Sequence, residues 1–222
     1  MKKTAIILGA TGLTGNILLQ KLIEDKRYGT IKLFSRSKID DLPNKVQQFI
    51  GDLLDLNQFK EAFKADEVYC CIGTTAKKTP NKSLYKQIDY GIPVHAAQLS
   101  KENKIKTFLV ISAMGANIKS SVFYNRTKGE MEHDVVQQNI KNTFILRPSL
   151  IGGKRKEHRF LEKVAIDLFK MTQPLFLGRL KEYQIINPET IAQAMLNLAN
   201  STNNTKVIST SNDIKKIAKN NK

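Results

Sequence analysis

This 222-residue sequence is poor in the residues that build disulfide frameworks and metal sites. Its two cysteines, Cys70 and Cys71, are neighbours in an apolar stretch. Consecutive strand side chains point to opposite faces there, so a bridge between them is strained. The three histidines show no spacing typical of a metal site. We therefore expect no disulfide framework, no metal and a cytoplasmic protein.

Long apolar runs are also absent. No stretch approaches the roughly 20 residues that cross a bilayer, so we expect a soluble protein with no membrane partner. Met-Lys-Lys followed by residues 4–10 could pass for the start of a secretory signal. The apolar run is short, however, and soon gives way to Gly12, Gly15 and Asn16. A buried strand is the favoured interpretation.

Acidic residues are outnumbered, with 36 lysines and arginines against 20 aspartates and glutamates and a formal charge of +16. A basic protein can be built to meet phosphates. The lysines recur along the whole chain, and no zinc-ligand spacing, helix-turn-helix pattern or aromatic strand stripe accompanies them. We therefore favour a solvated lysine-rich surface and expect no nucleic-acid partner.

The patterning predicts one α/β domain over residues 1–222, because 41% apolar side chains suffice for one continuous core. Strand-like apolar runs alternate with segments of helical period, which predicts a doubly wound, mostly parallel sheet of Rossmann type. The expected strands are Lys3 to Leu8, Ile31 to Phe34, Val46 to Ile50, Glu67 to Cys71, Lys106 to Ser112 and Thr143 to Arg147. The clearest expected helices between them are Asn16 to Asp25 and Leu56 to Phe63.

Glycines follow the first expected strand in the order Gly9, Gly12 and Gly15, and a helix is expected to open there. Such glycines allow a tight turn and a close approach of backbone to a pyrophosphate, while the helix N-terminus offers N–H groups to it. The spacing is G-x-x-G-x-x-G rather than G-x-G-x-x-G. A plain strand-to-helix turn is the alternative, but the context favours dinucleotide binding.

The end of the second expected strand indicates the cofactor. NAD-binding domains place an acid there to accept hydrogen bonds from the ribose, whereas this chain has Arg36 between Ser35 and Ser37. A guanidinium and two hydroxyls suit a 2′-phosphate. The sequence therefore predicts that NADP(H) is preferred over NAD(H), although Arg36 could also be one more basic surface residue.

Two further strand ends give supporting signals. Asp52 follows the third strand, where a carboxylate suits an adenine amino group, and Gly73 and Thr74 follow the fourth beside the expected pyrophosphate or nicotinamide ribose. Asp52 could equally cap a helix, and Gly73 could be a plain turn residue.

A candidate catalytic set comes from the fifth strand and the segment after it. Ser112 ends the strand, and Tyr124 and Lys128 lie four apart on one helix face. A carbonyl reductase needs a proton donor at the substrate oxygen, and an ammonium beside a phenol favours the phenolate. We predict Tyr124 as acid/base, Lys128 as its electrostatic partner and ribose ligand, and Ser112 as the group that orients the substrate oxygen. An exposed helix face is the alternative for the Tyr-x-x-x-Lys pair.

Together these motifs resemble the short-chain dehydrogenase/reductase superfamily, specifically the atypical branch near the Tat-interacting-protein-like oxidoreductases. The matching stretches are Ile7 to Gly15, Cys70 to Thr75, Val110 to Ala116, Ser120 to Glu130 and Leu146 to Ser149. The resemblance implies cofactor contacts at Gly9, Thr11, Gly12, Leu13, Gly15, Arg36, Asp52, Leu53, Gly73 and Thr74, with Ser112, Tyr124 and Lys128 as the catalytic set. The asparagine that completes a tetrad in many members has no clear counterpart, because residues 87–91 read Gln-Ile-Asp-Tyr-Gly.

Residues 150–222 are harder to interpret, and the resemblance implies that they shape a substrate pocket. Helical spacing is present at Phe160 to Met171 and at Pro188 to Ala199, the second opened by proline. After residue 200 we expect a short strand around Val207 to Ser209 and then a soluble tail.

The sequence therefore predicts an NADP(H)-dependent oxidoreductase acting on a small carbonyl or alcohol. The main alternative is a non-catalytic protein of the same fold that senses the NADPH to NADP⁺ ratio, since fold alone does not establish turnover. A nucleotide-sugar epimerase or dehydratase is disfavoured by the small C-terminal portion. Substrate identity, stereochemistry and oligomeric state, a homodimer included, are left open.

Overall fold

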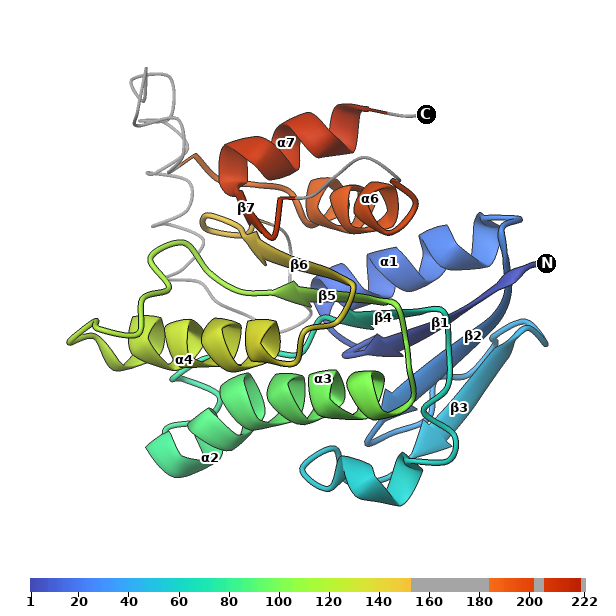
Figure 1. Ribbon diagram of the computed structural model, residues 1–222, viewed down its shortest axis with the longest axis horizontal. Coiled ribbons are helices and arrows are strands. Elements are labelled where there is room, and N and C mark those ends of the chain that lie inside the picture. Colours follow the sequence, from blue (N-terminus) through green and yellow to red (C-terminus); the bar gives the residue numbers. More distant parts are fainter. Residues whose placement is uncertain (153–183, 202–205, 221–222) are drawn as a thin grey trace.

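The computed structural model describes residues 1–152, 184–201 and 206–220. Within them the core is a seven-stranded parallel sheet in the order β3-β2-β1-β4-β5-β6-β7 (Figure 1). The strands are β1 (Lys3–Leu8), β2 (Tyr28–Ser35), β3 (Val46–Ile50), β4 (Glu67–Cys70), β5 (Thr107–Ile111), β6 (Asn142–Arg147) and β7 (Ile208–Thr210). The predicted doubly wound Rossmann-type sheet is confirmed. The order reverses direction between β1 and β4, which is where such sheets bind ligands.

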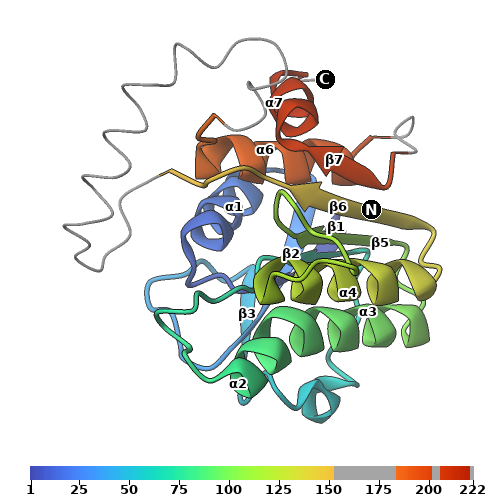
Figure 2. The same cartoon turned by 90° about the vertical axis from the view of Figure 1, so that its left-hand side faces the viewer.

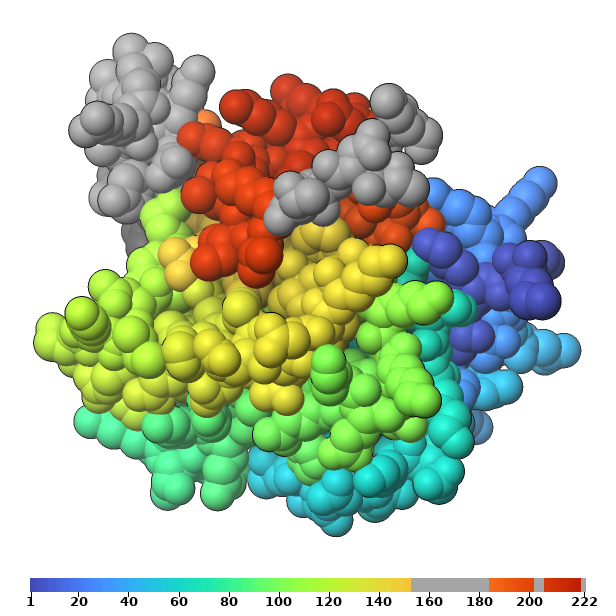
Figure 3. Space-filling model, viewed as in Figure 1, coloured from blue at the N-terminus to red at the C-terminus, as the bar shows by residue number. Residues whose placement is uncertain are grey.

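Helices cover both faces of the sheet (Figures 1 and 2). One layer is α1 (Leu13–Glu24), α6 (Pro188–Ala199) and α7 (Ser211–Lys219), and the other is α2 (Lys82–Lys86), α3 (Ile92–Glu102) and α4 (Phe123–Gln137). In the space-filling view, α7 forms the upper surface, with α4 and β6 below it (Figure 3).

The alternation of strand side chains builds two cores. In β1, Ala5 and Ile7 pack into the core on the α1 and α6 side, while Ile6 and Leu8 pack into the core beneath α3 and α4. All four are fully buried, so β1 is apolar from Ala5 to Leu8, as a strand segment covered on both faces must be.

One expected helix differs from the structure, and another is not tested by it. The helix expected at Leu56 to Phe63 is a single 3₁₀ turn at Leu56–Phe59. Leu56, Phe59 and Phe63 are buried as the helical spacing requires, but so short a segment gains too few hydrogen bonds to extend as an α-helix. The helix expected at Phe160 to Met171 lies outside the described residues.

The soluble tail expected after Val207 to Ser209 is also wrong. The strand is present as β7, but the chain then forms α7, which packs against α6. Its start is fixed by a capping box in which the Thr210 side chain accepts from the Asp213 N–H and the Asp213 side chain accepts from the Thr210 N–H. Ile214 and Ile217 then face the core at helical spacing. The capping pair and the spacing of the two isoleucines are both visible in the sequence, but the polar composition of the segment favoured a tail over a helix.

A buried polar network fixes the amino ends of the central strands. The Glu67 carboxylate accepts hydrogen bonds from the Tyr28 and Tyr69 hydroxyls, each at 2.7 Å, and pairs with Lys3. Asn200, just after α6, donates to the Tyr28 hydroxyl at 2.8 Å. The carboxyl ends of the same strands, at the opposite edge, carry the predicted site residues.

Candidate active site

The turn after β1 has no room for side chains at two of its three glycines. Gly9 has φ of +87°, and a Cβ there would lie 2.8 Å from the carbonyl oxygen of Cys71. A Cβ on Gly15 would lie 2.1 Å from the carbonyl oxygen of Gly9. The Gly12 N–H donates to that same oxygen at 3.0 Å. The glycines therefore let the first turn of α1 pack directly on the end of β1 and beside the end of β4.

The N-terminus of α1 is open to an anion. Leu13 is the first helical residue, and the cap residue Gly12 has no side chain to bind the first N–H groups. Thr11 is exposed in the turn ahead of it. Free N–H groups and the positive end of the helix dipole together suit a pyrophosphate. This arrangement fits a bound dinucleotide.

The ends of β2 and β3 carry the predicted adenosine-side contacts. Arg36 is exposed one residue beyond β2, where the Ser35 hydroxyl donates to the Ser37 carbonyl at 2.7 Å and shapes the turn. Asp52 is exposed after β3, and its Oδ1 accepts from the Leu54 N–H at 3.0 Å. Leu53 between them is buried. The carboxylate thus has a local turn role and still faces solvent.

After β4 the chain is held by a residue that the sequence analysis did not assign. Gly73 is exposed, and the N–H of Thr74 donates to Asp89 Oδ2 at 2.7 Å. Asp89 lies in the single π-helical turn Gln87–Gly91 between α2 and α3. This segment is where the tetrad asparagine was sought.

The other oxygen of Asp89 pairs with the predicted catalytic lysine. Lys128 Nζ lies 2.8 Å from Asp89 Oδ1, and the exposed fractions of the two residues are 3% and 1%. Burial alone lowers the pKa of Lys128. The Asp89 carboxylate and the nearby Tyr124 raise it, however, and the net shift is upward. Tyr124, one turn earlier on α4, is 40% exposed.

Ser112, just beyond β5, is held by a second ion pair. Its hydroxyl donates to Glu132 Oε1 at 2.5 Å, and Glu132 accepts a bidentate contact from Arg147 of β6, with Nε at 2.9 Å from Oε1 and Nη2 bonded to Oε2. The pairing with Glu132 raises the pKa of Arg147. Ser112 and Glu132 are both buried. Because its own hydrogen goes to Glu132, Ser112 offers lone pairs to a ligand in this arrangement.

The structure therefore places Tyr124 and Lys128 on α4, links Ser112 to the same helix through Glu132, and adds Asp89, Glu132 and Arg147 to the predicted set. Tyr124, Lys128 and Glu132 follow one another at intervals of four along α4, so they lie on one face. Glu132 could have been found by extending the Tyr-x-x-x-Lys spacing by one turn. Asp89 and Arg147 gave no local signal, because their roles depend on contacts distant in sequence.

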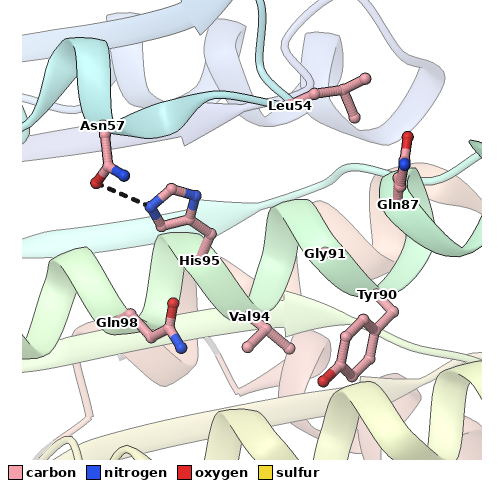
Figure 4. Close-up of a pocket in the computed structure, with 8 residues that line it drawn as sticks. All are labelled: Leu54, Asn57, Gln87, Tyr90, Gly91, Val94, His95 and Gln98. Atoms are coloured by element: carbon pink, nitrogen blue, oxygen red, sulfur yellow. Dashed lines mark hydrogen bonds between the residues drawn. The ribbon is translucent and has the colours of Figure 1, made fainter.

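A groove of about 630 Å³ lies on the outer side of α3 and has none of the predicted site residues in its lining (Figure 4). His95 Nε2 is 3.1 Å from Asn57 Oδ1 within it. The lining residues are Leu54, Asn57, Gln87, Tyr90, Gly91, Val94, His95 and Gln98. In the part of the chain that is described, no three His, Cys, Asp or Glu side chains are grouped to hold a metal ion.

Comparison with known proteins agrees with this geometry. A family described as NAD(P)H-binding matches residues 9–166, from the first glycine to beyond β6. The chain belongs to this family. The predicted membership of an NAD(P)-binding group of proteins is thereby confirmed, and the matched region contains every residue of the candidate site.

Relatives of similar length support the family assignment. Protein FMP52, mitochondrial, of Debaryomyces hansenii is 30% identical over 203 residues, covering 88% of this chain and 87% of the relative. Protein HTATIP2 of Rattus norvegicus is 30% identical over 171 residues, covering 75% and 70%. The match therefore extends over most of both proteins.

Solved structures show the same fold at low identity. A UDP-glucose 4-epimerase of Thermotoga maritima with UDP-glucose has a TM-score of 0.70 and 15% identity, covering 97% of this chain and 81% of that one. MoeE5 in complex with UDP-glucose and NAD has a TM-score of 0.68 and 12% identity, covering 97% and 80%. At these identities the likeness shows the fold alone.

The expectation of a cytoplasmic protein is wrong. The FMP52 relatives of Debaryomyces hansenii, Meyerozyma guilliermondii and Candida albicans are all named as mitochondrial proteins. The absence of a disulfide framework, on which the expectation rested, does not distinguish one reducing compartment from another. Among the described helices, none has the length and apolar character needed to cross a membrane.

Proposed function

We propose that this NAD(P)H-binding protein is an oxidoreductase that uses NADP(H) in preference to NAD(H) and interconverts a small carbonyl and its alcohol. The observation that carries the proposal is the row of side chains Tyr124, Lys128 and Glu132 on one face of α4, which we call the stripe. In it, Tyr124 lies one turn from the buried Lys128, which pairs with Asp89 beside the end of β4. A buried lysine beside a phenol suits a role in proton transfer, and this one is held at the end of β4, next to the glycine turn that is proposed to bind the dinucleotide.

The cofactor contacts follow from the strand ends. Gly9, Gly12 and Gly15 admit the pyrophosphate, with Thr11 and Leu13 at the helix start. Arg36 would hold the 2′-phosphate, Asp52 and Leu53 would hold the adenine, and Gly73 and Thr74 would hold the nicotinamide half. When bound, the cofactor supplies or accepts the hydride.

The protein's own groups handle the proton and the substrate oxygen. In reduction, Tyr124 would give its phenolic proton to the substrate oxygen, and the Lys128 ammonium would stabilise the phenolate that is left. Ser112 accepts a hydrogen bond from the alcohol hydroxyl, because Glu132 takes its own hydrogen. Ser112, Tyr124 and Lys128 are thus the proposed catalytic residues.

The domain organisation belongs to the same proposal. We place the whole of residues 1–222 in one NAD(P)-binding domain, with residues 150–222 contributing the pocket wall. Residues 153–183 of this portion lie outside the described residues.

The test is Tyr124→Phe, which removes the acid and keeps the ring. NADPH affinity should be unchanged, whereas reduction of accepted aldehydes, ketones or quinones, followed by NADPH absorbance, should fall about 10²-fold or more. Tyr90→Phe is the matched control, because the Tyr90 hydroxyl donates to Asp134 away from the stripe.

Two results separate the alternatives. If Tyr124→Phe reduces the best substrate as fast as wild type, the acid/base assignment is wrong. If wild type binds NADPH tightly and reduces no carbonyl in the panel, the NADPH-sensing alternative replaces the enzyme.

A further inference from the structure

Tyr85 carries a buried hydroxyl that has no hydrogen-bond partner among the described residues. The residue is 4% exposed, and its hydroxyl is one of two buried side-chain polar atoms without a hydrogen bond in the described part of the chain. Leaving such a group unpaired is costly, so native proteins rarely keep one without a ligand or water to pair it. A phenylalanine would fill the same space without that cost.

Tyr85 lies beside the proposed active site. Tyr85 lies on α2, one turn before Asp89. Its ring meets the ring of Tyr124 edge-on, with centroids 6.4 Å apart, and that of Phe123 with centroids 5.6 Å apart. Burial raises the pKa of Tyr85, and the charges of Asp89 and Tyr124 raise it further. The hydroxyl therefore stays protonated at neutral pH and serves as a hydrogen-bond donor.

We infer that the Tyr85 hydroxyl donates a hydrogen bond to a second oxygen of the substrate, next to the oxygen that Tyr124 protonates. The inference rests on the proposed function and narrows it. Two neighbouring phenols that each engage an oxygen select a substrate with oxygens on adjacent carbons, a 1,2-dicarbonyl or a 2-hydroxycarbonyl compound. A simple ketone makes no bond to the Tyr85 hydroxyl, so on binding it gains one hydrogen bond fewer than the dicarbonyl does.

The first test is the stability of the protein without ligands. Tyr85→Phe removes a hydroxyl that bonds to none of the described residues, so the melting temperature of the variant should equal or exceed that of wild type. Tyr69→Phe is the matched control, because the Tyr69 hydroxyl is bonded to Glu67 and lies 3.0 Å from that of Tyr28. Its melting temperature should fall by a few degrees. A comparable fall in Tyr85→Phe would show a structural role for the hydroxyl and overturn the inference.

The second test compares matched pairs of substrates with NADPH: 2,3-butanedione with 2-butanone, and 1-phenyl-1,2-propanedione with propiophenone. Wild type should prefer the dicarbonyl in each pair by about tenfold or more in kcat/KM beyond the ratio of their uncatalysed reduction by borohydride, the scale of one hydrogen bond. Tyr85→Phe should lose this preference and keep its activity on the simple ketones. NADPH affinity should be unchanged.

The remaining outcomes are distinct. If Tyr85→Phe keeps the wild-type preference while Tyr124→Phe abolishes reduction, the inference is wrong and the proposed function stands. If Tyr85→Phe weakens NADPH binding, the hydroxyl contacts the cofactor, and the substrate assignment is overturned. If wild type reduces no compound of the panel, the proposed function fails, and the inference fails with it.

Discussion

Lys128 Nζ lies 2.8 Å from Asp89 Oδ1, and both residues are almost fully buried, so the proposed catalytic lysine is half of a buried ion pair. The same aspartate accepts the Thr74 N–H at the end of β4. One carboxylate therefore fixes both the proposed ribose ligand and the backbone beside it. It occupies the segment where an asparagine was sought, and it brings a full negative charge in place of a neutral amide.

Breaking that pair from either side should be costly, because each single change leaves a buried charge without its partner. Asp89→Asn and Lys128→Met should each lower the free energy of unfolding by about 3–5 kcal/mol, measured by denaturant titration. The double variant should lose less than the sum of the two. Strict additivity would show that the two charges do not stabilise each other.

The same variants should separate stability from binding. Lys128→Met should weaken NADPH binding and turnover together, because the lysine is proposed both to hold the ribose and to favour the phenolate. The double variant should regain stability without regaining NADPH affinity. Calorimetric titration of the folded variants measures this, and full recovery of affinity in the double variant would exclude a direct contact between Lys128 and the cofactor.

The glycine turn makes a second prediction. A Cβ on Gly15 would lie 2.1 Å from the Gly9 carbonyl oxygen, so Gly15→Ala must push α1 away from β1. We expect a loss of about 1–3 kcal/mol in stability and a loss of NADPH affinity of about tenfold or more. Gly91→Ala is the control, because the nearest atom to its Cβ would be 4.0 Å away. That change should leave binding intact and stabilise the helix by about 0.5–1 kcal/mol.

The proposed preference for NADP(H) assigns the 2′-phosphate contact to Arg36. The side chain is exposed beyond β2, ready to meet a 2′-phosphate, and a charge-assisted contact to phosphate is worth about 1.5–3 kcal/mol. NADPH should therefore bind about tenfold or more tightly than NADH, and Arg36→Asp should reverse the order. Lys38→Ala, two residues on, should change the preference little. Equal affinities of wild type for the two cofactors would contradict the assignment.

Much of the fold could be predicted because the central strands are largely apolar on both faces. The expected first strand matches β1, the expected fifth strand contains the fully buried β5, and Pro188 to Ala199 matches α6. Such strands are recognisable as apolar runs bounded by glycine or polar residues, because the side chains on both of their faces are buried in one of the two cores. Leu56 to Phe63 shows the limit, because burial at helical spacing does not require a full helix.

The site was less predictable for a related reason. Glycines and the Tyr124 to Lys128 spacing are local patterns, whereas Asp89 and Arg147 act on residues 39 and 15 positions away, at Lys128 and Glu132. A buried charge is recognisable only once its partner is known. In the sequence, Arg147 is the last residue of an ordinary apolar strand. Its partner Glu132 can be recognised only in the structure, where β6 pairs with β5.

The buried phenols and thiol make a final prediction about alkaline pH. Burial, then the Glu67 charge, raises the pKa of Tyr28 and Tyr69, and burial raises the pKa of Cys70 to about 11. Each of these groups is neutral when protonated, and the folded protein holds its proton more tightly than the unfolded chain does. Their contribution to stability is therefore complete below the unfolded pKa values, near 9 for the thiol and 10 for the phenols, and is lost as pH rises through the higher folded values. Lys128, whose pKa is also raised, acts in the same direction above about pH 10.5.

These groups should therefore leave the melting temperature unchanged between pH 7 and about 8.5. They should make it fall steeply from about pH 9.5 upward. Tyr69→Phe, which removes one of the phenols, should lower the melting temperature at pH 7 but flatten the alkaline fall. A fall of equal steepness in wild type and Tyr69→Phe would show that the buried phenol does not hold its proton as the Glu67 network requires.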